Sequence, residues 1–575
     1  MLKRVFSYMR EYKKYAWSGL LCIGVEVVLE ITVPLLMADL IDYGVTNADG
    51  TYIIKKGLQM ALCAVLALIL GVGSAKFSAL AGQGLGANIR KAEYEKLQSY
   101  SFSNIDHFSV SSLVTRLTSD VTNIQNAVST GMRPFGRSPV MLIFATSFAF
   151  RINSTLALVF LVALPTLAVL LILIIINVGP LYGRMQSAID QVNRCIQENL
   201  TAIRVVKSYV RGDYEVEKFG VVNENLKSES EKAFGTAVLN MPAMQFVMYG
   251  TILGILLIGG RLINEGQMMI GQLTSFLSYV LLILNSLMMM SNVFLLMTRS
   301  LASAERIMEV IDEKIDITDE NAKDIAVAKG EIEFDHVWFK YKDTAKEYVL
   351  SDVSFHIKPG QTVGIIGQTG SSKTTLVQLI PRLYDVTKGE VKIDGINVKE
   401  YPVRHLRDAV AMVLQKNTLF SGSLIDNLRW GNENATLDEI KEACQIACVD
   451  EFVDRLADGY DTEMGQEGVN VSGGQKQRIC IARAILKKPK VLILDDSTSA
   501  VDTATEAKIR RGLAEKLPDM TKIIIAQRIS SVRHADQIII MDRGHVEAIG
   551  THESLLRDNQ IYQEIYASQK EGADL

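Results

Sequence analysis

The stretch TVGIIGQTGSSKTTLVQLI, residues 362–380, sets the architecture of the C-terminal half of the chain. Its apolar start predicts a strand at 362–366, its small residues predict a loop at 367–375, and its spacing then predicts a helix at 376–380. A strand, a glycine-rich loop with Lys-Thr and a helix form a P-loop, in which backbone N–H groups and the helix N-terminus hold phosphates. The sequence therefore predicts an α/β domain that binds a nucleotide.

Several residues of this loop have predictable roles. We expect Lys373 to contact the outer phosphates and Thr374 to ligate Mg²⁺. Ser372 stands where the pattern has a glycine just before the lysine, so we expect the loop geometry or the nucleotide affinity to differ. The expected phosphate-binding residues are Gly367, Gln368, Thr369, Gly370, Ser371, Ser372, Lys373, Thr374 and Thr375.

Three further segments support this prediction. Residues 331–341 alternate like a strand, and residues 491–495 form an apolar run that ends in Asp495, a carboxylate suited to hold Mg²⁺. Between the P-loop and this run lies VSGGQKQR, residues 471–478. Ser472 is a good N-cap, and a helix that starts there would present free N–H groups and a positive dipole end to an anion.

With residues 471–478 the chain resembles the ABC transporter ATPases, and the resemblance covers its whole length. It implies that Tyr341 stacks on adenine, that Gln415 belongs to the Q-loop and that residues 499–502, ending at Asp502, form the D-loop. ATP and Mg²⁺ are the implied cofactors, with Mg²⁺ held by Thr374, Gln415 and Asp495. The implied signature residues, which would bind the γ-phosphate of ATP held by a second subunit, are Ser472, Gly473, Gly474 and Gln475.

Two positions depart from the family pattern. Asp496 stands where the family has the glutamate that positions the attacking water, and its carboxylate is one methylene shorter, a retreat of about 1 Å. Gln527 replaces the family's switch histidine, and it cannot carry the positive charge of an imidazolium. We expect a degenerate site that binds ATP and hydrolyses it slowly. The alternative is that aspartate and glutamine still suffice.

The signature remains serviceable, whereas the P-loop side is impaired. A homodimer would pair two poor P-loop sides, but a heterodimer would pair this signature with an intact partner. We therefore expect a second, non-identical ABC half-transporter as the partner.

The N-terminal half is built for a membrane, because about 20 apolar residues cross about 30 Å of hydrocarbon. The apolar stretch 138–183 would run to about 70 Å as one helix, so we expect it to fold back near residues 151–154. The six expected spans lie at about 15–38, 57–80, two within 138–183, 236–260 and 271–297.

Lysine and arginine are frequent at 81–130 and 184–235, which places these loops in the cytoplasm. An even number of spans returns the C-terminal half to the cytoplasm. We expect a multi-pass protein of the cell membrane whose long cytoplasmic loops are helical. Residues 116–120 and 198–207 resemble parts of the two intracellular loops of exporter-type family members.

The predicted fold is therefore an all-α six-helix transmembrane domain followed by a cytoplasmic α/β P-loop ATPase domain with a helical subdomain. The expected division is 1–14, an interfacial helix; 15–305, the transmembrane domain; 306–329, a linker; and 330–575, the nucleotide-binding domain. The net charge of −4 gives no electrostatic reason to expect nucleic acid as a partner. The six cysteines form no CxxC pair, which favours scattered reduced thiols.

Glu26 and Glu30 lie one turn apart in the first expected span. Carboxylates at membrane depth are candidates for binding a cationic substrate or lining a water-filled cavity. The alternative is that neighbouring helices satisfy them. The resemblance as a whole implies ATP-driven export of amphipathic or drug-like molecules. Export of lipid or peptide, or an ATP-gated channel or regulatory subunit, are the alternatives.

Overall fold

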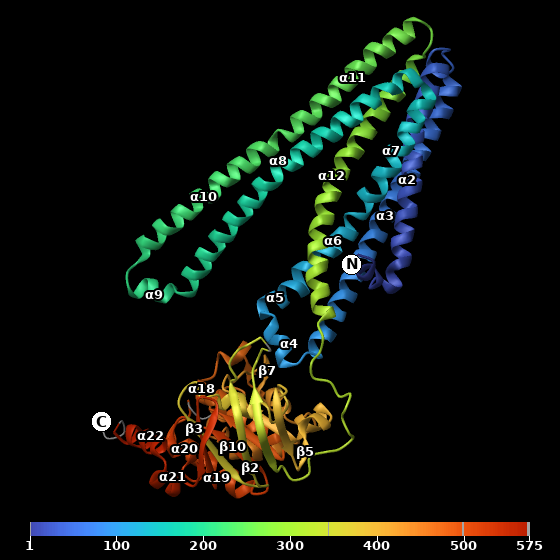
Figure 1. The fold of residues 1–575 in the computed structure, drawn as a ribbon. Helices are drawn as coiled ribbons and strands as arrows, with labels where there is room; N and C mark the ends of the chain where they lie inside the picture. Colours follow the sequence, from blue (N-terminus) through green and yellow to red (C-terminus); the bar gives the residue numbers. More distant parts are fainter. Residues whose placement is uncertain (1, 343, 497–499, 572–575) are drawn as a thin grey trace. The chain divides into compact units, whose positions relative to one another are not determined.

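The computed structural model describes residues 2–342, 344–496 and 500–571. The chain forms two compact units, which are described separately below (Figure 1). The first unit, Met1–Gln98 with Val110–Asp312, is helical. The second unit, Ser99–Ser109 with Glu313–Leu575, carries the strands.

The described helices of the first unit include seven that are longer than 20 residues. Two short segments, η2 and η3, are π-helical turns within longer helical stretches. The elements are α1 (Leu2–Ser7), η1 (Arg10–Tyr12), α2 (Lys13–Asp39), η2 (Leu40–Val45), α3 (Gly50–Gln98), α5 (Val110–Thr115), η3 (Arg116–Asp120), α6 (Val121–Ser129), α7 (Met132–Ile152), α8 (Ser154–Thr201), α9 (Ile203–Ser208), α10 (Gly212–Val238), α11 (Asn240–Asn264) and α12 (Ile270–Asp312).

The expected fold-back near residue 151 is confirmed. α7 ends at Ile152 and α8 begins at Ser154, with Asn153 extended between them. The side chain of Asn153 caps α8 by accepting a hydrogen bond from the backbone N–H of Leu156 at 3.0 Å. A single capped residue is therefore enough to reverse the chain between two apolar helices.

Each expected span falls on a long helix, but the count of six stays a prediction. Among the described residues, three helical stretches are long and apolar enough to cross a membrane: Arg10–Val45, Gly50–Gln98 and Gly212–Asn264. Ser154–Leu170 and Ile270–Ser286 are shorter apolar stretches of helix. α3, α8 and α10 continue well beyond the apolar windows, as the helical periodicity of the loops predicts.

Figure 1 shows α2, α3, α7 and α12 running side by side, whereas α8 lies beside α10 and α11 in a long hairpin that splays away from them. The membrane core is assembled where α2, α7, α8, α11 and α12 converge. Its buried residues include Val27, Met141, Phe160, Ile255 and Tyr279.

A second core lies at the cytoplasmic end of this unit. Val5 and Met9 are buried there against α3, α6 and α12. The basic N-terminal segment forms two short helices, α1 and η1, and Phe6 stays exposed beside the buried Val5 and Met9. That this segment lies on the membrane surface stays a prediction.

The second unit contains three sheets. One is antiparallel with strand order β2-β1-β4-β5, one has six strands in the order β12-β11-β3-β10-β9-β6, and a small one pairs β7 with β8. The strands are β1 (Ile332–Phe339), β2 (Leu350–Ile357), β3 (Thr362–Gly367), β4 (Lys388–Ile393), β5 (Ile396–Asn397), β6 (Val410–Val413), β7 (Gly422–Ser423), β8 (Glu463–Met464), β9 (Val491–Asp495), β10 (Thr521–Ile525), β11 (Gln537–Asp542) and β12 (His545–Gly550).

Helices pack against the six-stranded sheet, and α15 and α16 also pack against α18. They are α4 (Phe102–His107), α13 (Lys373–Gln378), η4 (Val398–Glu400), α14 (Val403–Ala409), α15 (Leu424–Arg429), α16 (Leu437–Ile446), α17 (Asp450–Val453), η5 (Gly459–Asp461), η6 (Gln466–Gly468), α18 (Gly473–Leu486), α19 (Thr503–Lys516), α20 (Ile529–Val532), α21 (His552–Asp558) and α22 (Gln560–Glu571).

The central strands are parallel, and this decides where the functional residues meet. β10 lies between β3 and β9, with Ile523 opposite Val363 on one side and Ile493 on the other. Because parallel strands end at the same edge of a sheet, the P-loop after β3 and the carboxylates at the end of β9 come together. All five residues of β9 and of β10 are buried, as the continuous apolar run of residues 491–494 predicts.

Candidate nucleotide-binding site

The P-loop connects β3 to α13, and its backbone has two residues in the left-handed region. Gly370 has φ +86°, which costs a glycine nothing, but Ser372 has φ +70° and ψ 24°. A residue with a Cβ adopts this conformation at a cost of about 1–2 kcal/mol. Ser372 therefore carries backbone strain directly before the helix, and the effect of the serine on nucleotide affinity stays a prediction.

The expected phosphate-binding residues take their places along this loop: 367–372 wrap from the strand to the helix, and 373–375 form the first turn of α13. The ammonium of Lys373 donates to the carbonyl oxygens of Gly367 and Gln368 at 2.9 and 2.8 Å and to Ser371 Oγ at 3.2 Å. Burial lowers the pKa of Lys373, although nearby carboxylates oppose this. Its charge thus points into the hollow of the loop, where phosphates would be held.

The residues expected to hold Mg²⁺ lie at the same edge. The hydroxyl of Thr374 donates to Asp495 Oδ1 at 3.0 Å. Asp495 is 1% exposed, and among the described residues its other oxygen, Oδ2, has no hydrogen-bond partner. Burial raises the pKa of Asp495, a penalty that a divalent cation would offset. Oxygen ligands of this kind suit Mg²⁺, so the residues fit the ion.

The two departures from the family pattern contact each other. The amide of Gln527 donates to Asp496 Oδ2 at 2.7 Å, and the side chain of Gln415 also hydrogen-bonds Asp496. Burial raises the pKa of Asp496, while these hydrogen bonds and the charge of Lys373 lower it. Its hydrogen bond to Asp496 therefore places Gln415 at the edge of the site.

Tyr341 lies beside the P-loop helix with its ring 44% exposed, available for stacking. Its hydroxyl and that of Thr375 are hydrogen-bonded at 2.8 Å, and its ring contacts Tyr384 edge-on at a centroid distance of 5.2 Å. Tyr384 is buried, and its hydroxyl donates to Asp106 of α4 at 2.6 Å. The ring of Phe102, at the start of α4, packs on Tyr384.

Through this contact the segment Ser99–Ser109 of the first cytoplasmic loop belongs with the nucleotide-binding unit. α4 is N-capped by Ser101, and the amide of Asn104 donates to the backbone oxygen of Lys314 at 2.7 Å. Sequence reasoning missed Tyr384 and Asp106, because nothing in the local pattern links positions 278 residues apart.

The signature segment begins α18 as expected. Ser472 is the N-cap and forms a capping box with Gln475, and Gly473 and Gly474 make up the first turn. A Cβ on Gly474 would lie 2.7 Å from the backbone oxygen of Ala500, so the glycine permits close packing against the segment after β9. In that segment Asp502 caps α19 by accepting from the N–H of Thr505 at 2.9 Å. Ser499 of the expected D-loop lies outside the described residues.

Comparison with known proteins gives this geometry a family. A family model for the ABC transporter transmembrane region matches residues 17–287, and one for the ABC transporter matches residues 350–499. The chain is 38% identical over the full length of both chains to the uncharacterized ABC transporter ATP-binding protein YfiB of Bacillus subtilis. The chain belongs to the ABC transporters.

Other matches of this ABC transporter agree. It is 31% identical to the putative multidrug export ATP-binding/permease protein YgaD of Bacillus subtilis, over 99% of each chain. A bacterial Atm1-family ABC exporter solved with ATP bound superimposes with a TM-score of 0.83 at 23% identity, covering 97% of this chain and 99% of that one. The fold is that of an ABC exporter: a helical transmembrane part with a cytoplasmic α/β ATPase domain.

The candidate substrate residues in the membrane are paired with arginines of α7. Glu26 is 5% exposed and accepts from Arg133 at 2.6 Å and from Arg137 at 3.4 Å, and Glu30 accepts from Arg137 at 2.6 Å. We call these four residues the membrane tetrad. The sequence analysis gave pairing of the two glutamates with neighbouring helices as the alternative. The tetrad is such a pairing. The arginines repeat the four-residue spacing of the glutamates, a signal that was present in the sequence.

Proposed function

We propose that this ABC exporter subunit pairs with a non-identical half-transporter to export amphipathic or drug-like small molecules, and that its own P-loop site binds ATP but hydrolyses it slowly. The hydrogen bond between Gln527 and Asp496 carries the proposal. The residue in place of the catalytic base and the residue in place of the switch histidine satisfy each other. The groups that form this hydrogen bond are not available to water or to the γ-phosphate while it lasts.

The binding half of the site supports retention of ATP. Lys373 directs its charge into the P-loop, Thr374 and Asp495 present oxygens to Mg²⁺, and Tyr341 offers an exposed ring for adenine. ATP and Mg²⁺ are therefore the proposed cofactors, with Gln415 as a further ligand of the ion. The chemistry that Mg²⁺ supplies is neutralisation of charge on the phosphates.

The opposite side of the domain supports a working site shared with a partner. The capping box uses the N–H of Gln475, and the N–H groups of Gly473 and Gly474 in the first turn of α18 are left to bind an anion. An intact signature is useful only when a second subunit brings ATP to it. A partner with glutamate and histidine at the corresponding positions would complete one competent site.

The helical unit also supports assembly with a second subunit. The tip of the hairpin formed by α8, α9 and α10 exposes large apolar side chains: Val205, Tyr209, Val210, Tyr214 and Val216. Val210 is 87% exposed. Exposed apolar groups gathered at one place mark an interaction surface, and the proposed occupant is the second half-transporter.

A substrate site in the membrane follows from the tetrad. Its two carboxylates and two guanidinium groups sum to zero charge, and the Arg133 side chain remains 41% exposed. A neutral cluster with an exposed polar end suits amphipathic molecules better than a pair of bare acids would. The multidrug export named for YgaD is consistent with this substrate class.

Measuring ATPase activity of the purified chain alone and of the chain assembled with a partner tests the proposal. We expect slow turnover alone and at least about tenfold faster turnover in the pair, because general acid–base groups contribute a hundredfold or more. Comparable turnover of the chain alone would refute the heterodimer. Uptake of a fluorescent amphipathic dye into inside-out vesicles against its gradient would distinguish a pump from a channel.

A further inference from the structure

The two units of the chain are joined at three places: after Gln98, after Ser109 and after Asp312. α3 ends at the first of these places, α5 begins at the second, and α12 ends at the third. Within this chain, these elements are the covalent routes by which movement of the ATPase unit enters the membrane helices. What holds the three elements together therefore decides whether that movement is transmitted.

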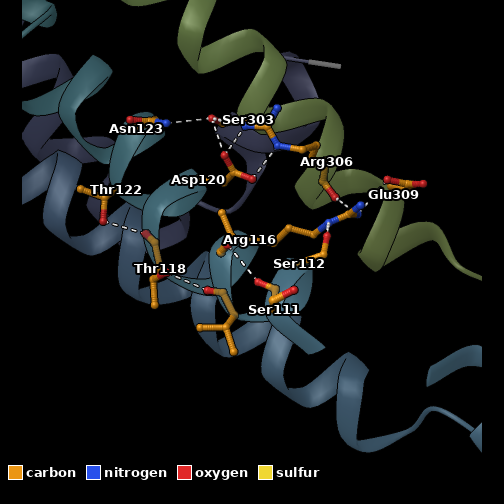
Figure 2. Close-up of polar contacts among 12 residues, drawn as sticks. Ser111, Ser112, Arg116, Thr118, Asp120, Thr122, Asn123, Ser303, Arg306 and Glu309 are labelled. Atoms are coloured by element: carbon orange, nitrogen blue, oxygen red, sulfur yellow. Dashed lines mark hydrogen bonds and ion pairs between the residues drawn. The ribbon is translucent and has the colours of Figure 1, made fainter. Parts of the chain in front are cut away.

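An ion pair between a buried aspartate and a half-exposed arginine joins the second element to the third (Figure 2). Arg306 of α12 donates through Nε to Asp120 Oδ2 at 2.7 Å and through a second nitrogen to Oδ1. Ser303, one turn earlier on α12, donates to the same Oδ1 at 2.8 Å. Asp120 is 1% exposed, and it closes the π-helical turn η3. Burial raises its pKa, but the hydrogen bonds from Arg306 and Ser303 more than offset this and hold it below its usual range.

A second contact lies one turn away on the same two elements (Figure 2). Arg116, at the start of η3, forms an ion pair with Glu309 at 2.8 Å and donates to the backbone oxygen of Arg306 at 2.7 Å. Arg306 thus contacts η3 twice: its side chain binds Asp120, and its backbone oxygen accepts from Arg116. The π-helical turn places Arg116 and Asp120 on the face that meets α12, and such turns frequently occur at functional positions.

The first element is tied in as well. Arg90 of α3 donates to the backbone oxygen of Leu117 in η3 at 3.3 Å and to Gln125 of α6 at 3.2 Å. All three elements that connect to the ATPase unit are therefore linked through η3. None of these residues belongs to the candidate nucleotide-binding site described above.

We propose that Asp120 and Arg306 are positioning residues for ATP-driven transport, which by binding η3 to the end of α12 make the three connections move as one body. The inference rests on the proposed export function. Without the pair, α5 and α12 would each follow the ATPase unit separately. Part of the movement that ATP binding produces would then become relative motion between these two helices and would not reach the membrane. The pair acts on coupling, whereas nucleotide binding stays intact.

The test uses the full chain assembled with its partner in lipid nanodiscs, with the six native cysteines replaced. Spin labels at Asn47→Cys and Asn264→Cys report the outer ends of α2 and α11 when ATP and vanadate are added. For Asp120→Asn and for Arg306→Gln we expect an about tenfold smaller equilibrium constant for the ATP-driven change, within the usual range of coupling between sites. The affinity for a fluorescent ATP analogue should not change.

The double variant Asp120→Asn with Arg306→Gln should lose no more than either single one, because both remove the same link. Glu95→Gln, in an exposed ion pair with Lys91 on α3, is the matched control and should respond like the unmodified protein. If Asp120→Asn does not fold, Arg306→Lys keeps the charge without the two-pronged contact and should show a smaller loss.

Three outcomes would overturn the inference. Single variants that respond to ATP like the unmodified pair would show that the link does not couple. Losses that add in the double variant, or a loss of ATP affinity, would show separate structural defects. An unmodified pair that does not respond to ATP would overturn the export function too, which distinguishes that failure from the others.

Discussion

The side-chain amide of Gln527 donates a 2.7 Å hydrogen bond to the carboxylate of Asp496. These are the two residues that stand in place of a base and a histidine, and the proposal of a slow site depends on their contact. Replacing one alone would leave its neighbour poorly matched. The pair is therefore best tested as a unit.

We expect Asp496→Glu combined with Gln527→His to raise the ATP turnover of the assembled pair about tenfold or more, since a positioned base typically contributes a hundredfold. Single-turnover hydrolysis at the site on this chain's P-loop is the measurement. Adding Asp495→Asn, which removes the Mg²⁺ carboxylate, should abolish the gain. Unchanged turnover in the double variant would contradict the degenerate-site proposal.

The left-handed conformation of Ser372 predicts that Ser372→Gly stabilises the protein by about 1 kcal/mol, because glycine adopts a positive φ without the clash of a Cβ. Chemical unfolding of the nucleotide-free protein measures this. Gly370→Ala, at φ +86°, is the opposite change in the same loop and should destabilise. Equal effects of the two substitutions would show that strain at residue 372 is unimportant.

The contacts of Tyr384 predict that one substitution weakens the stimulation of the ATPase by substrate and leaves the affinity for ATP unchanged. Tyr384→Phe removes the hydrogen bond to Asp106 but keeps the ring that contacts Tyr341 and Phe102. We expect unchanged affinity for ATP and a several-fold weaker stimulation of the ATPase by substrate, since one neutral-to-charged hydrogen bond contributes about 1.5–3 kcal/mol.

Tyr348→Phe is the control for this substitution. The ring of Tyr348 packs on Trp338 with a centroid distance of 5.1 Å, and we expect no change in ATP affinity or in stimulation. If Tyr384→Phe weakens ATP binding and stimulation to the same degree, the hydroxyl supports the adenine site and not the loop.

Glu93 predicts a pH-dependent stability. It is fully buried on α3, and among the described residues neither of its carboxyl oxygens has a hydrogen-bond partner. Burial, together with the charge of Asp120, raises the pKa of Glu93 from 4.5 to about 8. The folded protein thus keeps a proton that the unfolded chain releases above about pH 4.5. The free energy of unfolding falls as the pH rises from there to about 8, and it falls no further above that value.

Glu93→Gln removes this titration. Its Tm should exceed that of the unmodified protein by about 2–4 °C at pH 8.5 and differ little at pH 5. Glu95→Gln on the same helix, where the carboxylate is exposed, should show no such difference. A shift of the same size at both pH values would indicate a packing effect instead of a proton.

The ion pairs of the membrane tetrad predict that replacing one member alone lowers the stability of the protein. Glu26→Gln leaves Arg133 without a charged partner, whereas Arg137 keeps Glu30. Breaking a buried pair on one side costs about 3–5 kcal/mol, and the partial exposure of Arg133 places this pair at or below the lower end of that range. Exchanging Arg133 as well should recover most of the lost thermal stability. If the double variant is stable and still exports amphipathic dyes, the tetrad holds the helices together and does not recognise substrate.

The sequence alone determined the elements with strong local signals. The apolar strand at 491–495, the N-cap at Ser472 and the reversal at Asn153 follow from short-range patterns, because hydrophobic spacing and capping act within a few residues. The P-loop and signature motifs likewise identified the nucleotide-binding half. The identity of Asp496 and Gln527 was visible too.

Only the tertiary structure decided which of these residues meet. The contact of Gln527 with Asp496 depends on β9 and β10 being neighbours in the sheet, and that of Tyr384 with Asp106 joins positions 278 residues apart. The partners of Glu26 lie on another helix, and the link between Asp120 and Arg306 spans 186 residues. Such contacts are set by the packing of whole elements, which no local pattern encodes.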